Sequence, residues 1–297
     1  MQEFISQDQA RQIINELLPG VGPIEFIDHS QNNLIAKIDD QYIFRSPKST
    51  EGLVRFDFEI QILQSLGERL GTPVPKLVKT SQDPPYLLAN YLRGEHLENR
   101  SIRALGPYKQ TEIGNQLAVF SYQLNQVLSP SGVKSARANS KLDQASPPWD
   151  KYFAQIFGVK QSNSKLDKLN KHYYELWQKI NKRSNDEIVI HDDLHANNLL
   201  FNDDMLSGIL DFEQINVGTI EQEFRNLYRL SEEILTPAAQ KYQDLTGNDV
   251  DLQAVRIWAI TVELAALSRQ IIKEDTNHWS YPRALLKLRY WLPDFPL

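Results

Sequence analysis

Three side chains suited to phosphoryl transfer occur close together in the second half of the sequence: Asp193, Asn198 and Asp211. Mg²⁺ prefers hard oxygen ligands, and one or two carboxylates with substrate phosphates and waters usually complete its shell. Asn198 and Asp211 have side chains for such a site. Asp193 could accept the proton of an incoming hydroxyl and align it for in-line attack. The competing interpretation is that these are solvated turn residues, because Asn and Asp also fit tight backbone bends.

Short apolar runs predict the elements that would position these side chains. Ile188–Ile190 predicts a strand leading into the loop, and Leu199–Phe201 predicts a second strand after it. Asn202–Asp204 would turn the chain, and Gly208–Leu210 would return it. Asp211 would then lie across a hairpin from the loop. The whole pattern favours a shared site over isolated turn residues.

The segment resembles the catalytic signature of the aminoglycoside phosphotransferase-like kinase family, which also includes choline kinases. The loop of that family reads His-Gly-Asp-x-x-x-x-Asn, and its metal segment reads Ile-Asp-Phe followed by Gly or Glu. The matching positions are His191, Asp193 and Asn198, and then Asp211-Phe212-Glu213. The resemblance implies a catalytic base at Asp193, magnesium ligands at Asn198 and Asp211, and a scaffold role for His191.

Three positions depart from that family pattern. Asp192 replaces the usual glycine and adds a negative charge beside Asp193. Gly218-Thr219-Ile220 stands where the family has Gly-Asp-Pro, and Glu223 stands where a structural Asp is usual. These departures leave open a catalytically inactive nucleotide-binding module.

A zinc site is the rival interpretation of this segment. His191 and His195 are four residues apart, as in the helical motifs of zinc hydrolases. That motif needs a helix so that both imidazoles share one face. The strand-like run before His191 and Asn197-Asn198 after His195 favour strand and loop instead, with His195 packed or hydrogen-bonded in the loop.

A second set of charged residues lies in the first third of the chain. Glu59 falls on the apolar stripe of a predicted helix, between Phe56 and Leu63, where an unpaired carboxylate would be costly. The preceding strand offers Arg45 as its partner, with Lys48 as the alternative. In protein-kinase-like folds, which the resemblance implies here, a basic residue on this strand pairs with a helix Glu and grips the nucleotide phosphates. A surface ion pair without a ligand is the competing interpretation.

The segment Tyr86–Glu95 resembles the hinge between the two lobes of that family. In such hinges backbone groups bond the adenine edge, and Ala89 and Tyr91 are expected to present them. The loop Asp28–Asn33 would cover the phosphates, although it contains no glycine.

Hydrophobic patterning predicts two lobes. The pattern indicates a small β-rich lobe over residues 1–93 and a larger helical lobe over residues 94–297. The family resemblance implies that the first is the nucleotide-binding lobe with its hinge and the second the catalytic and substrate-binding lobe, so the expected fold class is α+β, a bilobal protein-kinase-like fold with a small antiparallel sheet. Before the hinge we expect a helix starting at the capping box of Ser6 and Gln9, strands at 24–27, 33–38 and 42–45, a helix over Thr50–Leu70 and a strand over 86–92. Beyond it we expect a helix through 113–127, an exposed loop over 130–149, and helical stretches at 149–180 and 250–292.

Composition narrows the functional class. Of 297 residues, 41% are apolar and 24% charged, and the net charge is −6, which argues against non-specific nucleic-acid binding. The absence of cysteine excludes disulfides, zinc–thiolate sites and cysteine nucleophiles. The chain begins without a signal-peptide pattern, and its longest apolar run is too short to cross a bilayer. A cytoplasmic protein with no membrane partner is expected.

Together with these residues, the family resemblance implies a kinase that uses ATP and Mg to phosphorylate a hydroxyl of a small molecule. An aminoglycoside or a related amino sugar is the first candidate acceptor. Glu232 and Glu233, on a predicted helix beyond Asp211, are candidate contacts for a cationic acceptor, and a solvated helix face explains them equally well.

Overall fold

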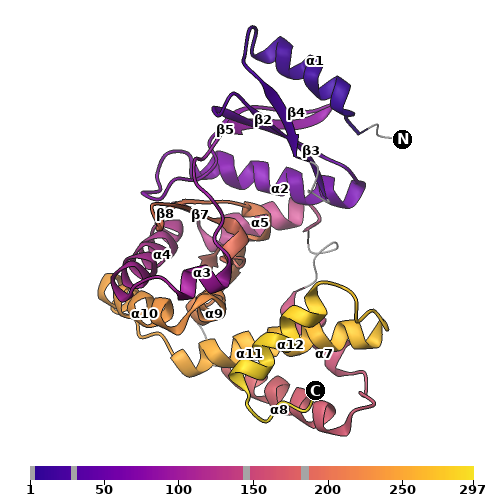
Figure 1. Cartoon of the computed structure of the whole chain (residues 1–297), viewed down its shortest axis with the longest axis vertical. Coiled ribbons are helices and arrows are strands. Elements are labelled where there is room, and N and C mark those ends of the chain that lie inside the picture. Colours follow the sequence, from indigo (N-terminus) through magenta and orange to yellow (C-terminus); the bar gives the residue numbers. More distant parts are fainter. Residues whose placement is uncertain (1–3, 28–31, 143–147, 182–186) are drawn as a thin grey trace.

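The computed structural model describes residues 4–27, 32–142, 148–181 and 187–297. A five-stranded antiparallel sheet and two helices form one end of the molecule, and helices dominate the rest (Figure 1). The predicted α+β, protein-kinase-like class is confirmed. The predicted cover of the phosphates falls largely on residues 28–31, which lie outside the described residues.

The N-terminal sheet has the strand order β1-β2-β3-β5-β4. Its strands are β1 (Ile24–Ile27), β2 (Asn33–Ile38), β3 (Tyr42–Pro47), β4 (Leu77–Gln82) and β5 (Pro85–Asn90). Side chains alternate between its two faces. Phe44 and Leu88 face helix α1 (Gln7–Leu17), whereas Leu87 and Ala89 face helix α2 (Thr50–Leu66). The sheet is therefore covered on both sides.

Local capping explains where these helices begin. Ser6 and Gln9 form the predicted capping box of α1. The sequence offers Thr50 as the cap of α2, but Thr50 is its first residue and Ser49 caps it, with the Ser49 Oγ accepting from the Gly52 N–H at 3.1 Å. The helix ends at Leu66, before Gly67, whose φ of 57° suits glycine, and so it is shorter than the predicted Thr50–Leu70.

The link between the two parts runs through Gly94. Its φ is +145°, and a Cβ there would lie 2.5 Å from Ser207 Oγ. Glu95 and Phe201 then exchange two backbone hydrogen bonds of 2.9 Å. Glycine at this position lets the link lie against a hairpin of the C-terminal part.

The C-terminal part holds the predicted hairpin and most of the helices. Its strands are β6 (Ile188–Ile190), β7 (Leu199–Asn202), β8 (Met205–Ile209) and β9 (Asn216–Gly218); β6 pairs with β9 and β7 with β8. Its longer helices are α4 (Pro107–Val127), α5 (Pro130–Asn139), α7 (Trp149–Phe157), α8 (Ser164–Asn181), α9 (Ile220–Leu230), α10 (Glu232–Thr246), α11 (Leu252–Ile272) and α12 (Ser280–Trp291), with the short α3 (Asn99–Arg103) before them. A separate aromatic-rich core joins α7, α8, α11 and α12, at the end of the molecule farthest from the sheet (Figure 1).

One prediction about these helices is wrong. Residues 130–149 were expected to be an exposed loop, but α5 spans 130–139, because Ser129 caps it and Pro130 takes the first helical position, where proline is tolerated. The helical stretch over 149–180 is two helices, α7 and α8, separated after Phe157. In the described residues, no helix is both long and apolar enough to span a bilayer.

Candidate active site

A cavity of about 530 Å³ lies between the sheet and the β7–β8 hairpin. Its size falls in the range of small-molecule sites. Apolar side chains of both parts line it, together with a few polar groups that include Arg45, Asn198 and Asp211. Residues far apart in the sequence therefore meet at one cavity.

The loop between β6 and β7 holds Asp193 in a fixed hydrogen-bond arrangement. Asn198 Nδ2 donates to the Asp193 carbonyl at 3.0 Å and to its Oδ2 at 3.1 Å. His195 Nε2 lies 3.4 Å from the same Oδ2, and its Nδ1 accepts from the Asn197 N–H. Burial opposes the charge of Asp193, but the hydrogen bond and charge of His195 outweigh it and lower the pKa of Asp193 to about 2. Asp193 is therefore an ionised acceptor at neutral pH.

Glu223 fixes the backbone of this loop. Its Oε1 accepts from the His191 N–H at 3.0 Å and its Oε2 accepts from the Asp192 N–H at 2.8 Å. Burial raises the pKa of Glu223 to about 7, against the effect of these two hydrogen bonds. The glutamate that replaces the usual aspartate thus performs a structural role with both oxygens.

Asp192 occupies a backbone conformation that favours glycine. Its φ is 66°, which a short polar residue tolerates better than most. Its carboxylate lies 2.6 Å from Arg225 Nη1 and accepts from Gln222 Nε2 at 3.0 Å and Trp149 Nε1 at 3.3 Å. The added negative charge is therefore neutralised by Arg225.

Sequence patterns alone do not indicate that Arg225 and Trp149 contact this loop. The one sequence signal for such a contact is Asp192, because an extra buried carboxylate needs a cation. The identity of that cation could not be predicted, since the family pattern offers no partner and Arg225 lies on a helix more than thirty positions further along the chain.

Asp211 and Asn198 are suited to hold a divalent cation. Asp211 has a left-handed φ of 65°, and its buried Oδ1 has no hydrogen-bond partner among the described residues. Burial, with the charges of Glu213 and Glu59, raises the pKa of Asp211. Because Asn198 turns its Nδ2 toward Asp193, its Oδ1 remains for another ligand. A carboxyl group whose pKa is raised by burial and neighbouring negative charge is suited to bind a cation, because the charge of the cation would stabilise its ionised form.

Arg45 and Glu59 form the expected ion pair. Arg45 Nη1 lies 3.0 Å from Glu59 Oε1, and the Glu59 side chain is fully buried. Glu59 Oε1 also accepts from the Phe212 N–H at 3.4 Å, which connects α2 to the residue after Asp211. Burial lowers the pKa of Arg45, but the charges of Glu59 and Asp211 outweigh it and raise that pKa. Arg45 lines the cavity, whereas the alternative, Lys48, does not.

The backbone groups of Ala89 and the Tyr91 N–H, which were expected to face the nucleotide, face strand β3 and the residue just before it, so the neighbouring Leu92 becomes the candidate in their place. The Tyr91 N–H donates to the Gln41 carbonyl at 2.7 Å, and Ala89 is paired with Ile43, two residues further along the same ladder. Bonded pairs alternate in antiparallel sheets, so both backbone groups of Ala89 also face β3. The Leu92 N–H also belongs to a residue that lines the cavity, and it has no hydrogen-bond partner within the described part of the chain.

The two candidate zinc histidines do not share a helix face. His191 is fully buried at the end of β6, and its Nε2 bonds the Leu210 carbonyl at 3.1 Å. His195 precedes a short 3₁₀ turn. No cluster of three His, Cys, Asp or Glu side chains that could hold a metal occurs among the described residues. This arrangement does not fit the zinc-hydrolase alternative.

The acidic pair expected to contact the acceptor lies elsewhere. Glu232 and Glu233 form the first turn of α10, where Glu232 lies 3.2 Å from Arg256 and Glu233 bonds Ser231. Neither residue lines a cavity next to the catalytic loop. The helix-start role of these glutamates explains their position, because acidic residues are favourable in a first turn.

His191 should make stability depend on pH. Burial lowers the pKa of His191 to about 4 from 6.5, so the unfolded state binds a proton at pH values where the folded state does not. Protonation of His191 in the unfolded state therefore costs little stability above pH 6.5, and it lowers the free energy of unfolding progressively as the pH drops from 6.5 toward 4. Between pH 7 and pH 4.5, the unfolding free energy of the wild type should fall by about 2 to 3 kcal/mol more than that of His191→Gln. Denaturant titrations at the two pH values measure the difference; equal pH slopes would contradict it.

The fold and the site together define a two-lobed protein of the protein-kinase-like class. A model of the phosphotransferase enzyme family matches residues 24–258, and the chain therefore belongs to this family. A search of curated proteins found no significant match.

Solved structures share the fold over nearly the whole chain. The GDP complex of wild-type aminoglycoside 2'-phosphotransferase-IIIa is 18% identical, with a TM-score of 0.72 over 96% of this chain and 98% of that chain. The streptomycin–ATP–APH(2")-IIa ternary complex is 18% identical, with a TM-score of 0.68 over 94% and 96%. Macrolide 2'-phosphotransferase type I is 16% identical, with a TM-score of 0.66 over 96% and 98%. At such identities the likeness establishes the fold.

Proposed function

We propose that the protein transfers the γ-phosphoryl group of ATP, with Mg²⁺, to a hydroxyl of a small molecule. The observation that carries the proposal is a cavity lined by Arg45, Asn198 and Asp211, in which Asn198 is bonded to Asp193 at 3.1 Å and Arg45 is paired with the buried Glu59. Membership of the phosphotransferase family and structural neighbours with bound nucleotides support it. We place the division between nucleotide and catalytic lobes at residues 93 and 94.

Each residue then has a defined part in the reaction. Arg45 would bind phosphate oxygens, and the Leu92 N–H would bond the base. Asn198 and Asp211 would hold Mg²⁺, which neutralises charge on the phosphates. Asp193 would orient the acceptor hydroxyl and accept its proton while the new O–P bond forms and the bond from the γ-phosphorus to the bridging oxygen of ADP breaks. A pKa near 2 suits a residue that orients the hydroxyl and takes its proton late.

Nucleotide binding and transfer can be measured separately. A nucleotide that binds the folded state alone stabilises it, so we expect Mg·ATP to raise the melting temperature of the protein. The same measurement with Mg·GTP shows which nucleotide the protein prefers. Acceptor-dependent ADP formation, followed by isolation of the phosphorylated product, tests the transfer. Binding without transfer to any acceptor would identify the alternative, a catalytically inactive nucleotide-binding module.

A further inference from the structure

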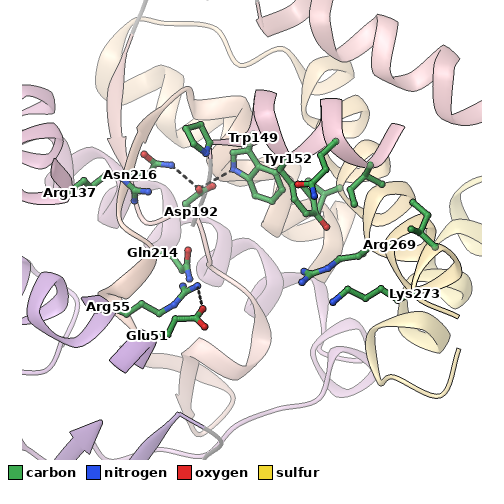
Figure 2. A pocket seen from close by; sticks show the side chains of 16 residues that line it. Glu51, Arg55, Arg137, Trp149, Tyr152, Asp192, Gln214, Asn216, Arg269 and Lys273 are labelled. Carbon is green, nitrogen blue, oxygen red and sulfur yellow. Dashed lines mark hydrogen bonds and ion pairs between the residues drawn. The ribbon is translucent and has the colours of Figure 1, made fainter. Parts of the chain in front are cut away.

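A second cavity, of about 730 Å³, opens beside the catalytic loop (Figure 2). Asp192, Gln214 and Asn216 line it, and these residues directly adjoin the segments that carry Asp193 and Asp211. Glu213 lines the first cavity and Gln214 lines the second. The second cavity therefore adjoins the segments that carry Asp193 and Asp211, on a side that the first cavity does not occupy, and we take it as the place for an acceptor. This step rests on the proposed function.

Basic side chains dominate the wall of this cavity. Four cations line it, whereas its acidic residues are Glu51 and Asp192. The cations are Arg55, Arg137, Arg269 and Lys273. Asp192 is already neutralised by Arg225 at 2.6 Å, and Glu51 is largely exposed and lies 3.6 Å from Arg55. Arg55 also lies 3.7 Å from Glu213, so the positive charge of this wall is carried chiefly by Arg269 and Lys273.

Arg269 and Lys273 are the most informative of these cations. Arg269 lies in the last turn of α11 and Lys273 is the C-cap residue of that helix, and both point into the cavity from the wall across from α2 (Figure 2). No carboxylate lies within 4.0 Å of either among the described residues; Arg269 bonds the Tyr152 hydroxyl instead. Two like charges four residues apart repel each other, and an anion bound between them would relieve that repulsion.

We propose that the acceptor alcohol carries an oxyanion group, a carboxylate or a phosphate, which binds Arg269 and Lys273 while its hydroxyl faces Asp193. Guanidinium and ammonium groups together form charge-assisted hydrogen bonds with such oxygens. Trp149 and Tyr152 supply aromatic surface beside them for the apolar part of the acceptor. An aminoglycoside, with several ammonium groups, would meet charges of its own sign here, and the glutamates expected to bind it lie on α10 instead.

The first experiment separates acceptors by charge. A protein-free cell extract, cleared of nucleotides with charcoal, is divided by ion exchange into anionic, neutral and cationic fractions, and kanamycin serves as an added cationic acceptor. Each is tested for enzyme-dependent ADP formation and for a phosphorylated product. We expect transfer to the anionic fraction. Transfer confined to the neutral fraction, the cationic fraction or kanamycin would overturn the inference and leave the proposed function standing. Transfer to none of them would contradict the proposed function itself.

Two further arms distinguish the anion and its binding residues. Sugar acids and sugar phosphates, separated within the anionic fraction, show whether a carboxylate or a phosphate is recognised. Arg269→Gln and Lys273→Gln should each raise the KM for the anionic acceptor about tenfold, with the KM for ATP unchanged. The matched control is Lys151→Gln, an exposed lysine of α7 that does not line the cavity. An acceptor KM in both variants equal to that of this control would refute the assignment of the two residues.

Discussion

Replacing Asp193 by Asn is expected to lower kcat by about 10²- to 10⁴-fold, the usual contribution of a positioned proton acceptor. The side chain keeps its size and can still accept from Asn198 at one oxygen, so the loop should keep its shape. What it loses is an ionised oxygen that can take the proton of the hydroxyl. Because Arg45 and Asp211 are unchanged, the dissociation constant for Mg·ATP should stay close to that of the wild type.

The matched control for this change is Asp203→Asn. Asp203 is exposed in the turn between β7 and β8 with a φ of 51°, a conformation that Asn also tolerates. The chemical change is the same, but it lies outside the cavity, and kcat should not change. Steady-state kinetics with a saturating acceptor and a melting curve for each variant make the comparison. Transfer by Asp193→Asn at the rate of Asp203→Asn would remove Asp193 from the mechanism.

Local sequence signals predict the elements that position this site well. The capping box at Ser6, the strand before His191 and the turn at Asn202–Asp204 each depend on neighbouring residues, so the structure has them where expected. The error over residues 130–139 has the same origin. Its serine and proline were interpreted as loop formers, whereas at the start of a helix they serve as the cap and the first residue.

Interactions between distant segments were harder to predict. Glu59 and Arg45 are fourteen residues apart, on a helix and the strand before it, and the expense of a buried carboxylate was enough to pair them. The hinge register depends on which strand takes the backbone groups of Ala89, and no local pattern specifies that. Arg269 and Lys273 line the second cavity because α11 packs beside α7, a contact that no local pattern predicts. For this reason the sequence pointed to a cationic acceptor, whereas the lining of the cavity favours an anionic one.

Glu263→Gln is expected to lower the free energy of unfolding by about 3 to 5 kcal/mol, because it leaves buried cations without their anion. The Glu263 side chain is fully buried on α11 and lies 2.8 Å from Arg229 Nε and 3.0 Å from Lys287 Nζ. Burial opposes its charge, but Arg229 and Lys287 outweigh this and lower the pKa of Glu263 to about 2. Arg229 cannot shed its proton in the variant, so its charge would remain uncompensated. Urea or guanidinium titration measures the loss.

Lys287→Met is the matched control, because it also removes a buried charge of this network but leaves the carboxylate of Glu263 in place. Burial lowers the pKa of Lys287 to about 7, so this lysine is partly neutral in the folded protein, and its removal keeps the Glu263–Arg229 pair. The loss of unfolding free energy should therefore be smaller than that of Glu263→Gln, and equal losses in the two variants would contradict this expectation.

The network of Glu263 also reaches the catalytic loop: Arg229 Nη1 bonds Asn226 Oδ1 at 2.8 Å, and Asn226 Nδ2 donates to the Asp192 carbonyl at 3.2 Å. Glu263→Gln should thus lower kcat as well as stability, whereas Lys287→Met, which leaves Arg229 in place, should keep kcat.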